Sequence, residues 1–376
     1  MPSGRDHSNL AAMDVASRLG RLRTGLGAAG CDALLVTSLV NVRYLTGFTG
    51  SAAMLLVTAG GALLLTDPKY PEQAAEQIAA AGAEVEIEAG TRQGQLEILD
   101  RATKGLSRLG LEAAALSWAA ADRLRAELGQ FASAGGELVA TEGVVEGLRV
   151  VKDAGELARI ELAADVADVA LAQVKERLGA GLTEAEFALE LDYEMRRRGA
   201  DDLSFETIVA SGPNGAMPHA RPSDRRIDEG DVVVVDFGAL VDGYHSDMTR
   251  SFTVGRVPEE MVEVLDAVFV AQRAGVRATR AGASASEVDD ACRRSLVEAG
   301  YGEHFVHGTG HGVGLEIHEA PAISGQSADI LDEGAVVTVE PGVYLPGTGG
   351  VRIEDTLVVT AQGARPLTKS TKDTTF

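Results

Sequence analysis

The chain has 376 residues, of which 45% are hydrophobic and 24% are charged, a balance typical of globular rather than disordered proteins. This length is long for one domain and comfortable for two. A net charge of −22, from 34 basic and 56 acidic residues, argues against a nucleic-acid binder, because a phosphate backbone would be repelled.

The expected compartment follows from the cysteines and the apolar runs. Cys31 and Cys292 lie far apart, which excludes a disulfide framework and a thiolate metal site and fits a reducing compartment. The first 20 residues lack the apolar core of a signal peptide. Gly60 and Gly61 split the apolar run at 52–66, which favours a β-hairpin over a membrane span. We therefore expect a soluble cytoplasmic protein that does not bind membranes.

Before residue 150, short apolar runs alternate with helical patterns. We expect strands at 33–37, 54–58, 62–66 and 85–89, and helices at 71–82 and 116–129. This alternation predicts an α/β domain over residues 1–150, with residues 1–10 disordered. From Val151 the pattern becomes a helical stripe of about 25 residues, so a second domain is expected over 151–376.

The second domain contains an internal repeat. Thr183 with Glu186, and Ser284 with Glu287, each have the spacing of a capping box that opens a helix. After each helix come a glycine-rich segment with histidine and a strand that ends in an acid, IDEGDVVVVDFG at 227–238 and LDEGAVVTVEPG at 331–342. A further strand then carries a second acid, and in the first half it follows a hairpin turn at Asp242-Gly243.

We interpret this repeat as a duplicated α/β unit whose two halves pack by pseudo-symmetry. Their strands would form one curved antiparallel sheet with the helices outside. The alternative is that both strands follow common turn chemistry independently.

The duplication would bring four carboxylates together, those of Asp236, Asp247, Glu340 and Glu354. Alternation along the last strand places Arg352 and Glu354 on one face. Two unit charges at ~4 Å repel by roughly 4 kcal/mol even at an effective dielectric near 20. Either some acids are protonated or cations lie between them. Two divalent ions would balance four carboxylates, and such sites favour Mn²⁺ or Co²⁺.

Histidines support a site in the same domain. The segment HGTGHGVGLEIHE carries His307, His311 and His318 among four glycines, which allow the backbone to approach a ligand closely. A single histidine would usually be structural, but three within twelve residues indicate a site when acids lie beside them.

With these acids and His311 in this order, the sequence closely resembles the dinuclear metallopeptidases of the pita-bread fold, peptidase family M24. That family includes methionine aminopeptidase, aminopeptidase P and prolidase. The segments that carry the resemblance are 211–222, 233–252, 307–319, 336–344 and 351–355. NVRYLTGFTGS at 41–51 and TDPKY at 66–70 resemble the creatinase/prolidase N-terminal domain, which methionine aminopeptidases lack.

The resemblance implies a creatinase-like α/β domain followed by a pita-bread catalytic domain, and a homodimer. It implies two divalent metal ions, manganese first and cobalt or zinc as alternatives. Asp236 would bind one ion, His311 and Glu340 the other, and Asp247 and Glu354 would bridge them. Further residues would act on the substrate or orient the region around Glu354, namely His219, His307, His318 and Arg352.

The activity implied is that of an Xaa-Pro aminopeptidase, which releases the first residue from a peptide with proline in the second position. A hydroxide formed between the two ions would attack the carbonyl before proline. His318 or His219 would stabilise the oxyanion, and Glu340 would carry the proton. Because an Xaa-Pro bond has no N–H, a site lined by imidazoles suits it.

Three alternatives stay open. A prolidase would accept only Xaa-Pro dipeptides. A metal-free binding module of the same fold would have lost the ligands that this sequence keeps. A hydrolase acting on a non-peptide C–N bond would keep the metal site and change the pocket.

Overall fold

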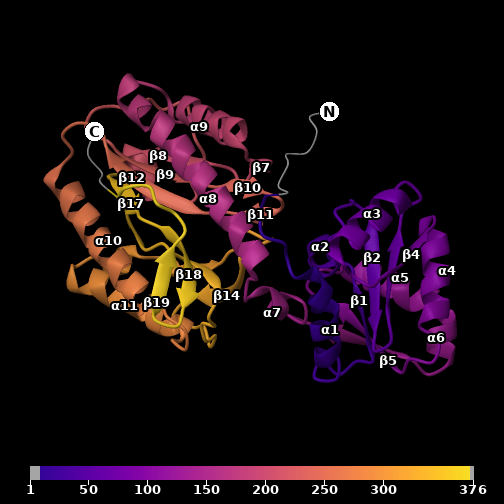
Figure 1. Cartoon of the computed structure of the whole chain (residues 1–376). Coiled ribbons are helices and arrows are strands. Elements are labelled where there is room, and N and C mark those ends of the chain that lie inside the picture. The colour runs from indigo at the N-terminus through magenta and orange to yellow at the C-terminus, as the bar shows by residue number, and fades with distance from the viewer. Residues whose placement is uncertain (1–8, 373–376) are drawn as a thin grey trace. The chain divides into compact units, whose positions relative to one another are not determined.

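The computed structural model describes residues 9–372, which fold as two compact units (Figure 1). One unit comprises Met13–Arg149, and the other comprises Val150 onward together with residues 9–12. The disorder expected for residues 1–10 concerns mainly residues 1–8, which lie outside the described residues. No helix in the described part of the chain is long and apolar enough to cross a membrane.

The unit formed by Met13–Arg149 is an α/β domain around a six-stranded sheet of order β4-β3-β2-β1-β5-β6. Its strands are β1 (Ala33–Val36), β2 (Ala53–Thr58), β3 (Ala62–Thr66), β4 (Glu86–Ala89), β5 (Arg108–Glu112) and β6 (Glu137–Thr141). The predicted hairpin is confirmed, because β2 pairs with β3 antiparallel around Gly60 and Gly61. Sequence analysis missed β5 and β6, whose mixed polarity, RLGLE and ELVAT, hides their parallel pairing.

Helices cover this sheet and bury its leucines. They are α1 (Val15–Gly25), α2 (Leu39–Thr46), α3 (Pro71–Ala81), α4 (Arg92–Ala102), α5 (Trp118–Glu127), α6 (Gly129–Ser133) and α7 (Glu146–Arg149). Leu35, Leu56 and Leu109 from the sheet pack with Leu99 and Leu124 from the helices. The α/β prediction for this part of the chain is confirmed.

The larger unit begins with the helix expected after Val151. This helix, α8 (Ala154–Val174), starts at a capping box of Asp153 with Glu156 and gives way to a 3-10 turn, so it is shorter than expected. The other helices are α9 (Glu184–Arg198), α10 (Glu259–Ala278) and α11 (Ala285–Glu298). Both predicted capping boxes are confirmed: Thr183 and Ser284 accept from the backbone of Glu186 and Glu287, whose side chains accept in return.

Two antiparallel sheets carry the duplicated strands. The first, of order β12-β9-β8, contains β8 (Ile208–Ser211), β9 (Val232–Phe237) and β12 (Met248–Thr253). The second, of order β14-β13-β15-β18-β19, contains β13 (Gly310–Gly312), β14 (Glu319–Ile323), β15 (Val336–Val339), β18 (Asp355–Thr360) and β19 (Gly363–Pro366). Smaller ladders join β7 (Asp202–Leu203), β10 (Ala239–Val241) and β11 (Tyr244–His245), and join β16 (Gly342–Leu345) to β17 (Gly349–Arg352).

The duplication is visible in the turns that start β9 and β15. Gly230 and Gly334 both have positive φ, of 96° and 88°, which an L side chain rarely adopts. The amide of Gly230 donates to the carbonyl of Val254, at 2.7 Å, and that of Gly334 donates to Val359, at 2.9 Å. Because the same turn closes onto the same neighbouring strand in each half, the repeat extends to backbone hydrogen bonding.

The two sheets meet where β12 runs beside β17 and the start of β18. The amide of Glu354 donates to the carbonyl of Thr249 at 3.1 Å, and the hydroxyl of Ser251 bonds both backbone groups of Arg352. In the described residues the expected single curved sheet is therefore divided: two main sheets and two smaller ladders are present, and the main sheets are joined along this seam.

Helices cover the outer faces of both sheets and leave the inner faces for polar residues. Val233 and Val235 pack against α8 and α9, so the alternation of β9 turns Asp236 to the inner face. In the second half Val351 and Ile353 join the core under α10 and α11, which turns Arg352 inward.

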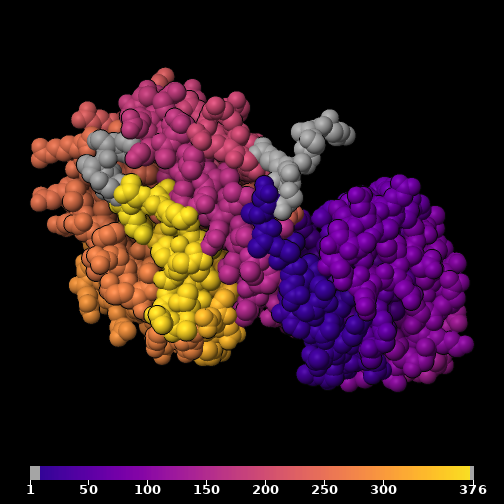
Figure 2. Space-filling model, in the orientation of Figure 1, coloured from indigo at the N-terminus to yellow at the C-terminus, as the bar shows by residue number. Residues whose placement is uncertain are grey.

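The C-terminal segment closes the outer side of the larger unit. In Figure 2 the yellow C-terminal residues lie beside the magenta surface of α8, where the amides of Lys369 and Ser370 donate to Asp168 at 2.8 and 2.6 Å.

Candidate metal centre

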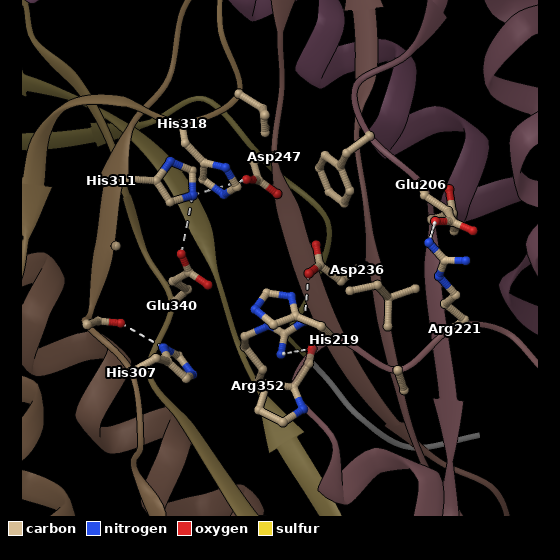
Figure 3. A pocket seen from close by; sticks show the side chains of 18 of the residues that line it. Glu206, His219, Arg221, Asp236, Asp247, His307, His311, His318, Glu340 and Arg352 are labelled. Atoms are coloured by element: carbon tan, nitrogen blue, oxygen red, sulfur yellow. Dashed lines mark hydrogen bonds and ion pairs between the residues drawn. The ribbon is translucent and has the colours of Figure 1, made fainter. Parts of the chain in front are cut away.

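A cavity of about 510 Å³ opens between the two halves of the larger unit, and polar side chains from both halves line it (Figure 3). The first half contributes His219, Asp236 and Asp247. The second half contributes His307, His311, His318, Glu340 and Arg352. Glu354 does not line the cavity and is 1% exposed.

Strand geometry explains where the four acids lie. Asp236, on β9, pairs with Thr249 on β12, and Asp247 immediately precedes that strand. Glu340 directly follows β15, where Pro341 removes a ladder donor and ends the strand. Glu354 sits at the seam, immediately before β18. Equivalent strand ends of the duplicated halves therefore deliver all four acids to one region.

Among the described residues, Asp247, His311 and Glu354 form a group that could hold a metal ion. One ligand atom from each lies within 4.8 Å of the other two. Nε2 of His311 lies 3.5 Å from Oδ2 of Asp247 and 3.4 Å from Oε1 of Glu340. Nδ1 of His311 lies 2.9 Å from the carbonyl of Gly312, so a proton on Nδ1 leaves Nε2 directed at the carboxylates.

Asp236 joins this group through a different contact. Its Oδ2 lies 2.6 Å from Nη2 of Arg352, so this carboxylate is paired with a buried guanidinium. Figure 3 shows Asp236 joined to Arg352, which lies below Asp247, His311 and Glu340.

Two buried carboxylate oxygens lack any hydrogen-bond partner in the described part of the chain. They are Oδ1 of Asp236 and Oε1 of Glu354, whose second oxygen, Oε2, accepts from the hydroxyl of Thr249 at 2.8 Å. A buried polar atom without a partner is costly, and more so when it is charged. Oxygen-rich donor sets with an imidazole suit divalent cations, so these residues fit a metal ion.

The pKa values of the four acids also indicate a site that fits a cation. Burial, followed by the repulsion of neighbouring carboxylates, raises the pKa of Asp247 and of Glu354 well above the ordinary value. Burial also raises the pKa of Asp236. For Glu340 burial acts in the same direction, but the hydrogen bond and charge of His311 outweigh it and lower the pKa. Charges and hydrogen bonds within the protein therefore offset the cost of burying the charged form of Glu340. They do not offset it for Asp236, Asp247 and Glu354.

The remaining predicted histidines surround the cavity. Nε2 of His307 lies 2.9 Å from the hydroxyl of Tyr344, and burial lowers the pKa of His307. The ring of His318 packs edge-on against His311, with centroids 4.3 Å apart, and burial and that neighbour lower its pKa. His219 is exposed on the cavity wall. His307 and His318 are thus neutral near pH 7 and can donate or accept a proton.

Arg352 is 3% exposed and fully engaged by the protein. Besides Asp236 it donates to Thr249, to Tyr344 and to the carbonyl of Pro218, at 3.1, 2.8 and 3.1 Å. These contacts fix the guanidinium as part of the scaffold beside the acids.

Sequence analysis missed Tyr344, which bridges His307 and Arg352. The signal was weak: the tyrosine lies four residues after Glu340, on β16, and only the pairing of β16 with β17 brings it to Arg352. Thr249 was also missed, although its register opposite Asp236 could have been inferred from the alternation of β12.

Glu184, at the first position of α9, was missed as well. It is fully buried and accepts from the amide and hydroxyl of Ser211, from the side chain of Asn214, and from the amide and hydroxyl of Ser223. One carboxylate thereby anchors both ends of the segment 211–223, which carries His219.

Sequence profiles of two known families match the chain. Residues 158–361 match Metallopeptidase family M24, and residues 18–151 match the Creatinase/Prolidase N-terminal domain.

Individual relatives cover nearly the whole chain. An uncharacterized peptidase of Bacillus subtilis is 41% identical over 356 residues, which is 95% of this chain and 99% of the relative. The solved structure of an Xaa-Pro dipeptidase from Bacillus anthracis is 38% identical, covers 96% of this chain and 99% of its own, and superimposes with a TM-score of 0.89. That of an X-Pro aminopeptidase from Thermotoga maritima is 35% identical over 96% of this chain and 99% of its own, with a TM-score of 0.84.

Proposed function

Because the chain belongs to Metallopeptidase family M24, we propose that it is a metal-dependent Xaa-Pro aminopeptidase, which releases the first residue of peptides with proline in the second position. The observation that carries this proposal is the cluster of Asp247, His311 and Glu354, together with the unpartnered buried oxygens beside it. The similarity to the Thermotoga maritima aminopeptidase supports the substrate class.

The second candidate is an Xaa-Pro dipeptidase. The specific observation in its favour is the Bacillus anthracis structure, which has the higher identity and TM-score of the two compared. Both candidates cleave the same bond and differ in the length of peptide that they accept.

Two divalent cations would be held by five residues. Asp236 would bind one ion, His311 and Glu340 the other, and Asp247 and Glu354 would be shared. Manganese suits this carboxylate-rich set with a single imidazole, and cobalt or zinc are the alternatives. When bound, such ions supply Lewis acidity, which polarises a carbonyl and makes water acidic enough to react near neutral pH.

The residues of the chain then bind and move protons. Glu340, whose pKa is lowered beside His311, is ionised and can accept the proton that the attacking water loses. His318 and His219 line the cavity and can donate to the carbonyl oxygen as negative charge develops on it. Proline offers no N–H, so the site needs no acceptor at that position.

The acids also favour the substrate's free amino group. Asp236, Asp247 and Glu340 line the cavity, and an ammonium group beside them would restrict attack to the first peptide bond. We extend the proposal to a homodimer, as the family resemblance implies, and to a cytoplasmic location, which the two buried free cysteines support.

The test is hydrolysis of Ala-Pro and of Ala-Pro-Ala-Ala by chelated protein to which Mn²⁺, Co²⁺ or Zn²⁺ has been restored. We expect cleavage of both peptides after the first residue, with the highest rate in Mn²⁺, and none after chelation. Cleavage of Ala-Pro alone would favour the dipeptidase, and no cleavage with any ion would overturn both candidates.

The same assay checks the histidines. His219→Ala and His318→Ala should each lower kcat/KM, by about 10²-fold or more if they stabilise the oxyanion. Unchanged kcat/KM in both variants would show that the proposed donors are wrong.

A further inference from the structure

The cavity extends from the acid cluster to a second charged pair, Glu206 and Arg221. Figure 3 shows these two side chains together on the side of the pocket away from His311 and Glu340. Glu206 lies just before β8, and Arg221 lies two residues after His219. The mechanism proposed above uses neither of them.

The contact between Glu206 and Arg221 is loose. Nη2 of Arg221 lies 3.3 Å from Oε2 of Glu206, and the two side chains are 82% and 66% exposed. Exposed ion pairs of this kind contribute little and exchange partners readily. The guanidinium has five N–H donors in a fork that matches a carboxylate, so Arg221 retains capacity for an anionic ligand.

Among the described residues that line the cavity, Arg352 has the other guanidinium, and it differs from Arg221 in exposure and in hydrogen bonding. It is 3% exposed, and it already donates to Asp236, Thr249, Tyr344 and the carbonyl of Pro218. A carboxylate brought in by a ligand would have to displace these buried bonds. Arg221 offers its charge without that loss.

Arg221 therefore lies at one side of the cavity, and His311 and Glu340 of the proposed metal centre lie at the other. A peptide whose first bond lies at that centre would extend its downstream carboxylates toward the far side of the cavity. Each residue of an extended peptide adds about 3.3–3.6 Å, so residues beyond the proline run away from the acids.

We propose that Arg221, opposed by Glu206, forms a subsite for the residue that follows proline and selects peptides with a carboxylate there. The inference rests on the proposed function and names a preferred substrate class, peptides of three or more residues with an anionic group after the proline. That group is the C-terminal carboxylate of a tripeptide or the side chain of an acidic residue.

The experiment measures kcat/KM on the metal-loaded full chain for four tripeptides, relative to Ala-Pro as an internal reference. Ala-Pro-Ala and Ala-Pro-Ala-NH2 differ in the terminal carboxylate. Ala-Pro-Glu-NH2 and Ala-Pro-Lys-NH2 differ in the side chain. The wild type should prefer the anionic member of each pair by about two- to fivefold, the range expected of one exposed charge pair.

Substitutions at Arg221 and Glu206 should change the preference for anionic peptides in different directions. Arg221→Gln should abolish it, Arg221→Glu should invert it in favour of the lysine peptide, and Glu206→Gln should increase it. An inversion of preference cannot result from a merely damaged fold. The matched control is Arg125→Gln, a 61% exposed arginine paired with Asp122 in the other unit, which should leave the preference unchanged.

The outcomes separate this subsite from the proposed function. If the variants leave the wild-type ratios unchanged, or if Ala-Pro is cleaved and no tripeptide is, the subsite is wrong and the peptidase stands. If the wild type cleaves none of these peptides, the proposed function is wrong and the subsite falls with it.

Discussion

Glu354 and Asp355 are adjacent in sequence and both 1% exposed, yet they lie on opposite faces of the same sheet. On the inner face, Glu354 has Thr249 as its hydrogen-bond donor and other carboxylates as neighbours. On the outer face, Asp355 accepts from Gln272 and Thr368 and forms ion pairs with Arg250 and Lys372.

The two faces differ in the direction of the pKa shifts. Burial and the charges of Glu340 and Asp236 raise the pKa of Glu354 well above its ordinary value. Burial acts the same way on Asp355, but Arg250 and Lys372 outweigh it and lower the pKa. A buried acid by itself thus does not indicate a ligand site. The informative feature is a buried acid that the protein leaves uncompensated.

The largest expected effect on the outer face comes from Asp355→Asn. It would leave Arg250 buried without its anion, and removal of one partner from a buried pair costs about 3–5 kcal/mol. Urea unfolding of the metal-free protein would measure the lost free energy of unfolding. The control is Asp165→Asn, which removes an exposed ion pair between Asp165 on α8 and Lys369 on the C-terminal segment. It should lower the free energy of unfolding by less than about 1 kcal/mol. Equal losses in the two variants would refute the distinction.

On the inner face, Glu354→Gln should have the opposite profile. The proposed metal ligand is lost, so kcat/KM should fall by at least about 100-fold, since outer-shell partners alone can cost that much. Metal content, measured by elemental analysis, should fall with it. The metal-free protein should be as stable as the wild type or more stable, because one repelling charge is gone. Full activity, or a clear loss of metal-free stability, would contradict the proposed role.

The smallest effect is a pH dependence that distinguishes the faces. Because folding raises the pKa of Asp247 and Glu354, the metal-free protein should lose stability as pH rises from the ordinary carboxyl range, about 4, through the raised values. Asp355, with a lowered pKa, contributes stability above that range and loses it as pH falls through its folded value.

Unfolding at pH 5 and pH 7.5 would check this prediction. We expect metal-free protein to be less stable at pH 7.5 than at pH 5, because the buried Asp247 and Glu354 carboxyls resist ionisation. Glu354→Gln should flatten the slope, and Mn²⁺ should reverse it because protons compete with the ion. A metal-free stability that rises from pH 5 to 7.5 would show that the inner acids are compensated within the protein.

Local signals in the sequence predicted much of this architecture. The capping residues at Thr183 and Ser284, the turn at Asp242-Gly243 and the two Asp-Glu-Gly turns each depend on neighbouring residues, so a single sequence shows them. Alternation along a strand then placed Arg352 and Glu354 on one face. The fold class predicted from these signals is confirmed, and the five ligand assignments stay predictions, although the structure gathers those residues in one region.

Other features depend on pairings between distant segments. Tyr344 meets His307 and Arg352 across 37 and 8 residues of sequence, and Glu184 meets Ser211 and Ser223 across 27 and 39. Asp355 differs from its neighbour Glu354 because Arg250 and Lys372, both distant in sequence or on the C-terminal segment, pack beside it. No periodicity signals such contacts, because each is decided by how separate elements pack.

The division of the acids between the two duplicated halves has a thermodynamic consequence. Asp236 and Asp247 belong to one half, and His311, Glu340 and Glu354 to the other, so an ion held by both sets cross-links segments about a hundred residues apart. Opening of either half would remove ligands from the ions. Ion binding would therefore stabilise the larger unit as a whole, by an amount that increases with the cation concentration.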